Sequence, residues 1–457
     1  MSGTASVIWE TRSLREVVTK LVDGSHNPPP KQDSGLPMLS ARNIDRGQVL
    51  FDNYRLISKS AFVSENARTR IAAGDVLLTI VGTIGRTAVV PDGSQPFALQ
   101  RSVAVLTPAA NLLPKFLCYQ LQSPAIQRHF EANARGTAQK GVYLKTLGQT
   151  PIVLPPLNVQ TEVVAEIEKQ FSRLDQAVAN LQRVKANLKR YKASVFKDAV
   201  EGRLVPTEAE LARREGRSFE TGEQLLESII EERRGQWQGK GKYKEPITQD
   251  TGEMFGLPDG WAAASVEQLT SLVEYGSSAK TDEDSTGIPV LRMGNIVNGE
   301  FLFDVLKYLP QDHNEFPKLF VEPGDVLFNR TNSPELVGKT AVFKGAVQTY
   351  SYASYLIRMR VVQGYVPVFL AAFINSTHGR EWVKKVVTQQ VGQANVNGTK
   401  LQALVVPLPP YDEQIRIVAE LERRVSLLRS VESEVDANLK RAQALRQATL
   451  AKAFAVN

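Results

Sequence analysis

Short motifs that could support catalysis are present, but each lacks a residue that its chemistry needs. Residues 27–30 read Asn-Pro-Pro-Pro, whereas a loop that holds a flipped base for modification needs an aromatic fourth residue. Residues 333–340 (SPELVGKT) approach a phosphate-binding loop, but Ser333 stands where that loop needs Gly. No Asp or Glu stands two residues before any Lys, so half of the common nuclease motif is also missing. The sequence therefore indicates no catalytic centre.

Metal ligands are equally scarce. His26, His129, His313 and His378 are scattered, and none pairs with another at the i, i+4 spacing of a helical metal site. Cys118 is the single cysteine, which excludes an internal disulfide and a cysteine-rich zinc site and favours a reducing, cytoplasmic setting. No run of about 18 apolar residues predicts a membrane span. The net charge of +7 permits a polyanionic partner without proving one.

A duplication that extends over half of the chain is the most informative feature of the sequence. Trp9 matches Trp261, and LPMLSARNIDRGQVLF (from Leu36) matches IPVLRMGNIVNGEFLF (from Ile288). Further along, PIVLPPLNVQTEVVAEIE matches VVPLPPYDEQIRIVAELE. Because the period is half of the chain, a solenoid of short repeats is excluded.

Each half has the same order of elements. Runs such as 76–81 and 102–108 predict strands, residues 114–130 predict a helix, and a Pro pair at 155–156 or 409–410 ends the body. A long helix follows, with apolar residues close to the a and d spacing of a coiled coil. These seam residues are Phe171, Leu174, Val178, Leu181, Leu188 and Val195, with Val184 filling the middle, and Leu421, Val425, Leu428, Val435, Leu439 and Ala442.

The sequence therefore predicts an α/β (α+β) fold. Two similar domains with twisted β-sheets would be joined by two long antiparallel coiled-coil helices, and the internal repeat would give pseudo-two-fold symmetry. A polar linker lies between the halves; its first part reads as helical and its second part as flexible. The predicted segments are a first body (1–156), a first long helix (157–203), the linker (204–256), a second body (257–410) and a second long helix (411–457).

This arrangement suits recognition of DNA at two points. A helix of about 45 residues is roughly 65–70 Å long, and one turn of B-DNA is about 34 Å. Two bodies held at the ends of such helices could read two half-sites separated by an unread spacer. The helices would then act as a ruler.

The chain resembles the specificity subunit of type I restriction–modification enzymes over essentially its whole length. PLPPYDEQIRIVAEL (407–421) is similar to the family's boundary motif. VLPPLNVQTEVVAEI (153–167) is a weaker copy, because Val159 replaces the Glu that Glu413 supplies in the second half. Residues 188–205 and 445–454 are similar to the family's helix ends, and LPDGW (257–261) is similar to the opening of its second recognition domain.

The resemblance implies a non-catalytic subunit that selects the DNA sequence for a larger complex. Each target-recognition domain would read one half of a bipartite site in double-stranded DNA, and the long helices would dock two modification subunits. Those subunits would supply S-adenosylmethionine and methylate adenine. Two motor/nuclease subunits would use ATP and Mg²⁺, although the sequence leaves open whether they are present. The chain itself would need no cofactor and no metal.

Base readout needs hydrogen-bond donors and acceptors on loops that reach a groove. The loops between matched blocks of the first body offer Ser25, His26, Lys31, Arg42, Thr83, Arg86, Gln100, Arg101, Ser102, Gln139, Lys140 and Tyr143. The second body offers Ser277, Ser278, Lys280, Arg292, Arg330, Asn332, Lys339, Tyr352, Ser354, Gln393, Asn395, Asn397 and Lys400. Any one of these could instead contact phosphate or only water.

Two further predictions concern residues outside this set. Asn43 and Asn295 recur in both copies, which favours a turn-forming role over base readout. The outer faces of the long helices are expected to dock the modification subunits. The candidates there are Glu162, Glu166, Gln170, Arg173, Arg416, Glu420 and Arg424.

Two alternatives remain open from sequence. A self-contained DNA methyltransferase would bind its cofactor as the isolated chain, and the missing glycine-rich loop argues against it. A coiled-coil adaptor with two protein-binding domains would show no sequence-specific DNA binding.

Overall fold

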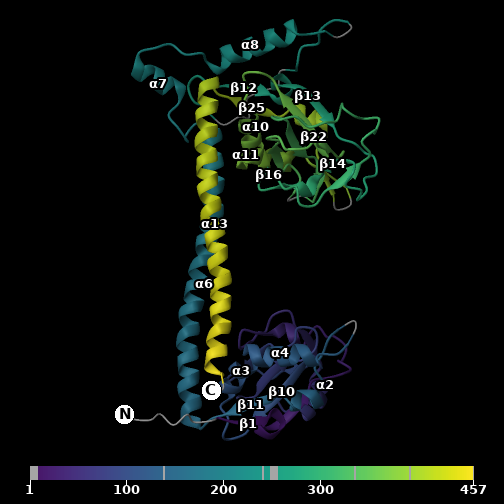
Figure 1. The fold of residues 1–457 in the computed structure, drawn as a ribbon, viewed down its shortest axis with the longest axis vertical. Helices are drawn as coiled ribbons and strands as arrows, with labels where there is room; N and C mark the ends of the chain where they lie inside the picture. The colour runs from purple at the N-terminus through teal and green to yellow at the C-terminus, as the bar shows by residue number, and fades with distance from the viewer. Residues whose placement is uncertain are drawn as a thin grey trace. The chain divides into compact units, whose positions relative to one another are not determined.

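The computed structural model describes residues 9–136, 139–238, 241–247, 256–333, 336–390 and 393–455. The chain forms two compact units, of which unit 1 comprises residues 1–183 and 435–457 and unit 2 comprises residues 184–434. Each unit contains one body of strands and short helices together with part of both long helices (Figure 1). Among the described residues, no helix is long and apolar enough to cross a membrane.

The body of unit 1 is built on an antiparallel four-stranded sheet in the order β2-β10-β7-β8. A three-stranded sheet (β6-β3-β9), the hairpin β4–β5 and the pair β1–β11 complete it. The strands are β1 (Glu10–Ser13), β2 (Val18–Asp23), β3 (Leu36–Leu39), β4 (Ile44–Asp45), β5 (Gln48–Val49), β6 (Arg55–Ile57), β7 (Val76–Thr79), β8 (Thr87–Val89), β9 (Ala98–Leu99), β10 (Val103–Pro108) and β11 (Pro151–Leu154). The helices are α1 (Leu14–Val17), η1 (Ala41–Asn43), α2 (Lys59–Thr69), α3 (Pro114–Leu121), α4 (Pro124–Asn133) and α5 (Leu144–Gly148).

The body of unit 2 repeats this plan, which confirms the predicted duplication. Its four-stranded sheet has the order β13-β22-β18-β20, and a further sheet, β19-β24-β23, has no counterpart among the described strands of unit 1. The strands are β12 (Ala262–Ser265), β13 (Thr270–Tyr275), β14 (Ile288–Leu291), β15 (Ile296–Val297), β16 (Glu300–Phe301), β17 (Lys307–Leu309), β18 (Val326–Asn329), β19 (Thr331–Asn332), β20 (Thr340–Val342), β21 (Ser351–Tyr352), β22 (Leu356–Val361), β23 (Thr388–Gln390), β24 (Gln393–Asn395) and β25 (Val405–Leu408). The helices are α9 (Val266–Leu269), η2 (Met293–Asn295), α10 (Pro367–Asn375), α11 (Thr377–Val386) and α12 (Gly398–Gln402).

The four-stranded sheet of unit 1 is covered on both faces. Val76 and Leu78 point into one apolar core with Phe116 of α3, whereas Leu77 and Val105 point into a second core on the opposite face. The alternation follows from the two-residue period of a strand. Both faces of this sheet therefore carry an apolar core.

The helix predicted over residues 114–130 is in fact two helices, α3 and α4. Ser123 lies between them in an extended conformation, and Pro124 begins α4. Proline has no N–H to donate to the preceding turn and disfavours a helical residue before it, so α3 ends there.

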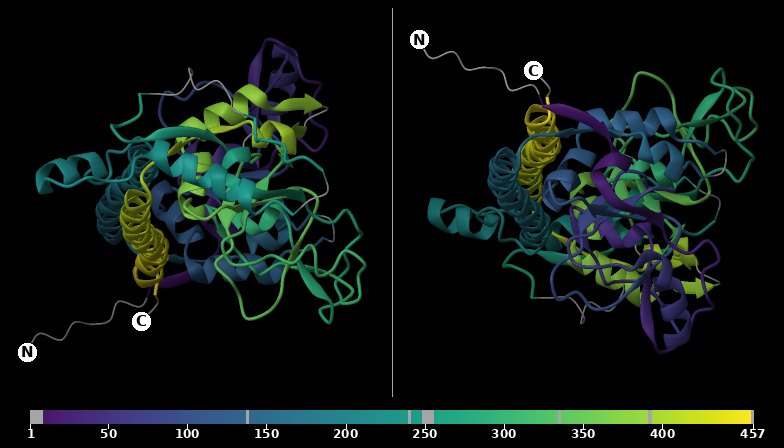
Figure 2. Two further views of the ribbon diagram at one scale, coloured as in Figure 1. Left: turned by 90° about the horizontal axis from the view of Figure 1, so that it is seen from above. Right: turned by 90° about the horizontal axis from the view of Figure 1, so that it is seen from below.

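The long helices α6 (Leu157–Val200) and α13 (Tyr411–Ala453) each begin directly after a Pro pair. In unit 1, Phe171 of α6 shares a core with Leu450 of α13. In unit 2, Val195 of α6 shares a core with Leu421 of α13. The start of one helix therefore meets the end of the other, as expected for the antiparallel pair, and Figure 2 shows the two coils as neighbours.

One residue of the expected seam is misplaced. Val184 is 41% exposed, whereas its neighbours Leu181 and Leu188 are half-buried. Counting heptads from Phe171 puts the seam at position 185, which is occupied by Lys185, so Val184 lies one position off the seam.

The first part of the linker is helical and packs on unit 2. It forms α7 (Glu208–Glu215) and α8 (Gly222–Gly235), each opened by a threonine capping box. Leu225 and Ile229 of α8 enter the core of unit 2, and Arg233 donates to the carbonyl oxygens of Glu267 and Gln268 at 2.8 and 3.0 Å. This part of the linker therefore belongs to the second body. The predicted flexible part includes residues 239–240 and 248–255, which lie outside the described residues.

Candidate nucleic-acid interface

One edge of the main sheet in unit 1 gathers the loops that carry most of the predicted DNA-binding residues. Strands β2 and β7 end at this edge and β10 begins there, because β10 is antiparallel to both. Backbone hydrogen bonds fasten the loops together: Arg101 N donates to Ser25 O at 2.8 Å, and Gly82 N donates to Lys140 O at 3.0 Å. We call residues 24–32, 80–86, 100–102 and 139–143 the first edge.

Most of the predicted residues of unit 1 are exposed. The exposed residues are His26, Lys31, Arg42, Thr83, Arg86, Arg101, Gln139, Lys140 and Tyr143, and the half-buried ones are Ser25, Gln100 and Ser102. Ser102 Oγ accepts a hydrogen bond from Ala41 N at 3.1 Å, which ties η1, and with it Arg42, to the first edge.

The corresponding edge of unit 2 is fastened in the same way. Ser277 N donates to Tyr352 O at 2.9 Å, Ser354 N donates to Ser277 O at 2.7 Å, and Val396 N donates to Arg330 O at 2.9 Å. We call residues 276–280, 330–333, 336–339, 352–355 and 394–400 the second edge. The backbone at Arg292 is held by a local hydrogen bond, in which Arg292 N donates to Asn295 Oδ1 at 2.9 Å.

The predicted residues of unit 2 are less uniformly accessible. Ser278, Lys280 and Asn397 are exposed, and Arg292, Arg330, Asn332, Lys339, Ser354, Asn395 and Lys400 are half-buried. Ser277 and Tyr352 are buried, and the side chain of Gln393 lies outside the described residues.

Burial changes what some of these side chains can do. The hydroxyl of Ser277 donates to Glu315, and burial raises the pKa of the Tyr352 phenol above its usual range. Lys400 Nζ donates to Val386 O at 2.6 Å, and Asn397 Oδ1 accepts from Lys400 N at 2.8 Å as the cap of α12. Ser277 and Tyr352 therefore shape the second edge from beneath its surface.

A close backbone approach supports each edge. A Cβ on Gly24 would lie 2.2 Å from Leu99 O, and a Cβ on Gly276 would lie 2.2 Å from Tyr352 O. Only glycine, which has no Cβ, permits two backbone segments to approach so closely. The two glycines occupy matching positions of the repeat.

Asn43 and Asn295 are buried and hold turns in the same manner. Asn43 Nδ2 donates to Leu50 O at 3.1 Å, and Asn295 Nδ2 donates to Leu302 O at 2.8 Å. Both side chains are thus engaged in the backbone, as a turn-forming role requires.

Sequence reasoning missed the side chains that organise the two edges. Asp23, at the end of β2, accepts from His26 at 2.8 Å and from Arg68. Tyr275, at the matching end of β13, accepts at its hydroxyl from Gly398 N at 2.6 Å, and its ring lies under Arg330. Only their place at a strand end just before a predicted loop could have indicated them.

A repeated glutamine was also missed. Gln160 Oε1 accepts from Leu113 N, and Gln414 Oε1 accepts from Val366 N, both at 2.8 Å. Each buried glutamine thus joins a long helix to the body of its own unit. Its identity in both copies of the boundary motif was the available signal.

The predicted partner-binding residues lie on α6 and α13. Glu162, Glu166 and Arg173 are exposed, and Gln170, Arg416, Glu420 and Arg424 are half-buried. Arg416 pairs with the buried Glu208 of α7 at 2.6 Å, so its charge is already engaged within unit 2. Hydrogen bonds from Arg423 and Arg424 lower the pKa of Glu420 to about 2.

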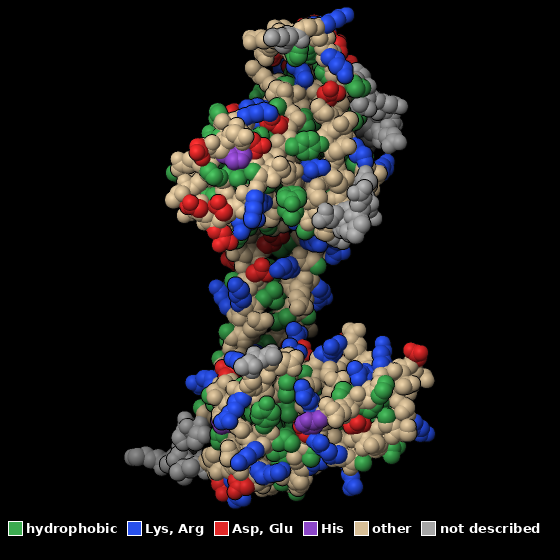
Figure 3. All heavy atoms as spheres, turned by 90° about the vertical axis from the view of Figure 1, so that its right-hand side faces the viewer, with side chains coloured by type: hydrophobic (Ala, Val, Ile, Leu, Met, Phe, Trp, Pro, Cys, Tyr) green, Lys and Arg blue, Asp and Glu red, His purple; other side chains and the backbone are tan. Residues whose placement is uncertain are grey.

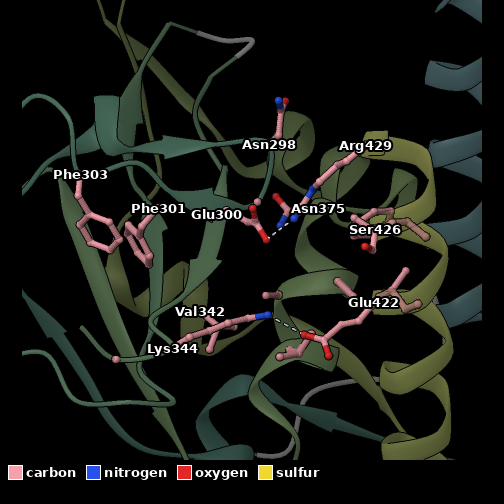
Figure 4. A pocket seen from close by; sticks show the side chains of 18 residues that line it. Asn298, Glu300, Phe301, Phe303, Val342, Lys344, Asn375, Glu422, Ser426 and Arg429 are labelled. Carbon is pink, nitrogen blue, oxygen red and sulfur yellow. Dashed lines mark hydrogen bonds and ion pairs between the residues drawn. The ribbon is translucent and has the colours of Figure 1, made fainter. Parts of the chain in front are cut away.

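A cavity of about 470 Å³ lies between α13, α10 and the β15–β16 hairpin of unit 2 (Figure 4). Its charged side chains pair with one another, Arg429 with Glu300 and Lys344 with Glu422, each at 2.7 Å. Its lining contains neither His nor Cys, and the described residues contain no cluster that could hold a metal ion. The charged groups of this cavity are therefore already engaged with one another.

The surface charge differs between the units. On the face of unit 1 that Figure 3 shows, Lys and Arg side chains are widely spread and Asp and Glu are few, whereas the face of unit 2 mixes both signs. A surface with spread positive charge suits contact with a phosphate backbone.

Comparison with known proteins agrees with this geometry. Residues 7–190 and 258–439 match the family described as type I restriction modification DNA specificity domain. The EcoKI specificity subunit of Escherichia coli K12 is 24% identical and the StySPI specificity subunit of Salmonella potsdam is 22% identical, each over 93% of this chain and 82% of the relative. A solved chain of a type I R-M system is 20% identical, covers 98% of both chains and has a TM-score of 0.65, which supports the fold. The chain therefore belongs to the type I restriction–modification specificity subunits, the non-catalytic components that recognise the DNA target.

Proposed function

We propose that the first and second edges each read one half of a bipartite DNA site. The observation that carries this proposal is the contrast between backbone and side chains. In both edges a glycine permits a close backbone approach and backbone hydrogen bonds join the loops, yet the two edges present different polar residues. A common frame with different donors and acceptors suits recognition of two different base sequences.

The exposed polar residues are the best candidates for contact with DNA. They are His26, Lys31, Thr83, Arg86, Arg101, Gln139, Lys140 and Tyr143 at the first edge, Arg42 beside it, and Ser278, Lys280 and Asn397 at the second edge. Half-buried residues such as Asn332 and Lys339 would contact DNA only through the atoms that remain accessible.

In this proposal the long helices set the spacing of the half-sites and dock two modification subunits. The exposed Glu162, Glu166 and Arg173 are candidate docking residues. S-adenosylmethionine would bind to the modification subunits, and ATP and Mg²⁺ to two motor/nuclease subunits where these are present. The complex would act in the cytoplasm, on double-stranded DNA.

Selection from a random DNA library tests the proposal. The full chain, co-expressed with its modification subunits, is expected to enrich two short sequence blocks separated by an unread spacer, with affinity that falls steeply as salt rises. Enrichment of no sequence would favour a coiled-coil adaptor. Binding of S-adenosylmethionine by the isolated chain would favour a self-contained methyltransferase.

A further inference from the structure

The guanidinium of Arg330 is engaged by its neighbours at the second edge. Nη1 is 3.4 Å from Ser354 O, and Nη2 donates to Asn395 Oδ1 at 3.1 Å. The Tyr275 ring covers one face, with its centroid 4.8 Å from Cζ, and Nε is buried. Bidentate recognition of guanine needs two free parallel N–H groups, so little of this fork remains available for a base.

These contacts join segments that lie far apart in the sequence. Arg330 follows β18, Ser354 precedes β22, and Asn395 ends β24. Tyr275 adds a further segment, because its hydroxyl accepts from Gly398 N at 2.6 Å, at the start of α12. We call this set of contacts the junction. The junction therefore fixes where residues 394–400 lie on the second edge.

The first edge shows what this position does when no arginine is present. Ile80 follows β7 as Arg330 follows β18, and the backbones of both make matching bonds. Val142 N donates to Ile80 O and Val396 N donates to Arg330 O, each at 2.9 Å. Ile80 is only 3% exposed and packs in the apolar core of unit 1. The matching position in the other repeat thus serves packing.

We propose that Arg330 and Tyr275 are positioning residues for DNA recognition by the second edge. They hold residues 394–400, with the exposed Asn397, in the arrangement that meets DNA, and Arg330 itself reads no base. This inference rests on the proposed function of the second edge. It differs from the simplest expectation for an arginine in a recognition loop, which is direct contact with guanine.

Two measurements on the full chain with its modification subunits test the proposal. Hydrogen exchange of residues 394–400 without DNA reports whether the junction holds them. Selection from random DNA reports which base pairs lose preference. The variants are Arg330→Ala, Arg330→Lys, Asn395→Ala and Arg330→Ala/Asn395→Ala, with Lys280→Ala as a control at an exposed site of the same edge.

Arg330→Ala is expected to speed exchange of residues 394–400 at least tenfold and to weaken preference at several base pairs of one half-site. Arg330→Lys should restore part of both, because lysine keeps the cation over the ring but not the planar fork. The double variant should lose little beyond Arg330→Ala, since both changes break the same junction. Lys280→Ala should leave the exchange unchanged. If Arg330→Ala fails to fold, Tyr275→Phe, which removes only the acceptor of the Gly398 bond, is expected to give the same pattern in weaker form.

Unchanged exchange with loss at a single base pair would overturn the proposal and make Arg330 a base reader. Faster exchange with intact preference would also overturn it, because the junction would then not serve recognition. If the unaltered complex enriches no sequence, the proposed function of the edge fails. In that case faster exchange in Arg330→Ala would still show that the junction exists.

Discussion

The first and second edges share the same backbone arrangement but differ in the side chains that make contacts at the strand ends. Gly24 and Gly276 permit the same close approach. Where the first edge has Asp23 with His26 and Arg68, the second has Tyr275 with Arg330. The backbone arrangement is the same in both edges, whereas these side chains differ. One fold can therefore present two different recognition surfaces.

The two boundary motifs differ for a structural reason. Glu413 accepts from Trp261 Nε1 at 2.9 Å and from Glu208 N at 2.8 Å, and burial raises the pKa of its carboxyl group. Glu208 lies at the start of α7, in the linker that follows α6. The matching residue of the first half is Val159, whose side chain cannot accept a hydrogen bond. The glutamate of the second copy therefore anchors the start of the linker to α13.

Lengthening both long helices is expected to have the largest effect on the recognised DNA. Four residues inserted after Arg183 and four after Glu434 add about 6 Å of helix, or roughly two base pairs of DNA, and keep the seam nearly in register. DNA selection should return the same two sequence blocks with a longer spacer. An unchanged spacer would refute the role of the helices as a ruler.

Gly276→Ala should disable one edge and spare the other. The new Cβ would lie 2.2 Å from Tyr352 O and 2.6 Å from Ala353 O, so the second edge must open. Preference in one half-site should fall more than tenfold in DNA selection, because small displacements of contacting groups are costly. Gly294→Ala is the control, since its Cβ would meet nothing within 4 Å. Gly24→Ala should affect the other half-site, and loss of both half-sites in either variant would contradict independent edges.

Glu413→Ala should destabilise unit 2 by about 2 kcal/mol, because the buried N–H groups of Trp261 and Glu208 lose their acceptor. Chemical denaturation with Trp fluorescence measures this free energy of unfolding. Val159→Ala, the matched change in the first half, should cost less than about 1 kcal/mol. Equal costs would mean that Glu413 does not anchor the linker.

Lys280→Ala should have the smallest effect. Lys280 is exposed at the second edge, so a phosphate contact would weaken binding a few-fold on all sequences and reduce the salt slope by about one. Lys344→Ala, which breaks only the ion pair with Glu422, is the control. Fluorescence anisotropy at several salt concentrations measures both. A change of sequence preference in Lys280→Ala would identify a base contact instead.

The sequence predicted the features that repeat or follow a regular period. The duplication, the start of each long helix after a Pro pair and most of the coiled-coil seam were visible as matched residues or as spacing. The turn-forming role of Asn43 and Asn295 followed from their recurrence. Each of these depends on a short stretch of chain.

The sequence could not predict contacts between distant segments. The hydrogen bond of the Ser277 hydroxyl requires Glu315, the junction at Arg330 requires residues 275 and 395, and the packing of α8 requires the second body. The break between α3 and α4 at Pro124 could have been predicted from the proline itself.

The most direct test of the central claim is sequencing of methylated bases in host DNA, with this gene intact, deleted and carrying Gly276→Ala. The intact gene is expected to give an adenine-methylated motif of two blocks with an unread spacer. Deletion should abolish the motif, and Gly276→Ala should relax one block only. The same methylation in all three strains, with the modification subunit expressed, would contradict recognition of DNA by two separate edges.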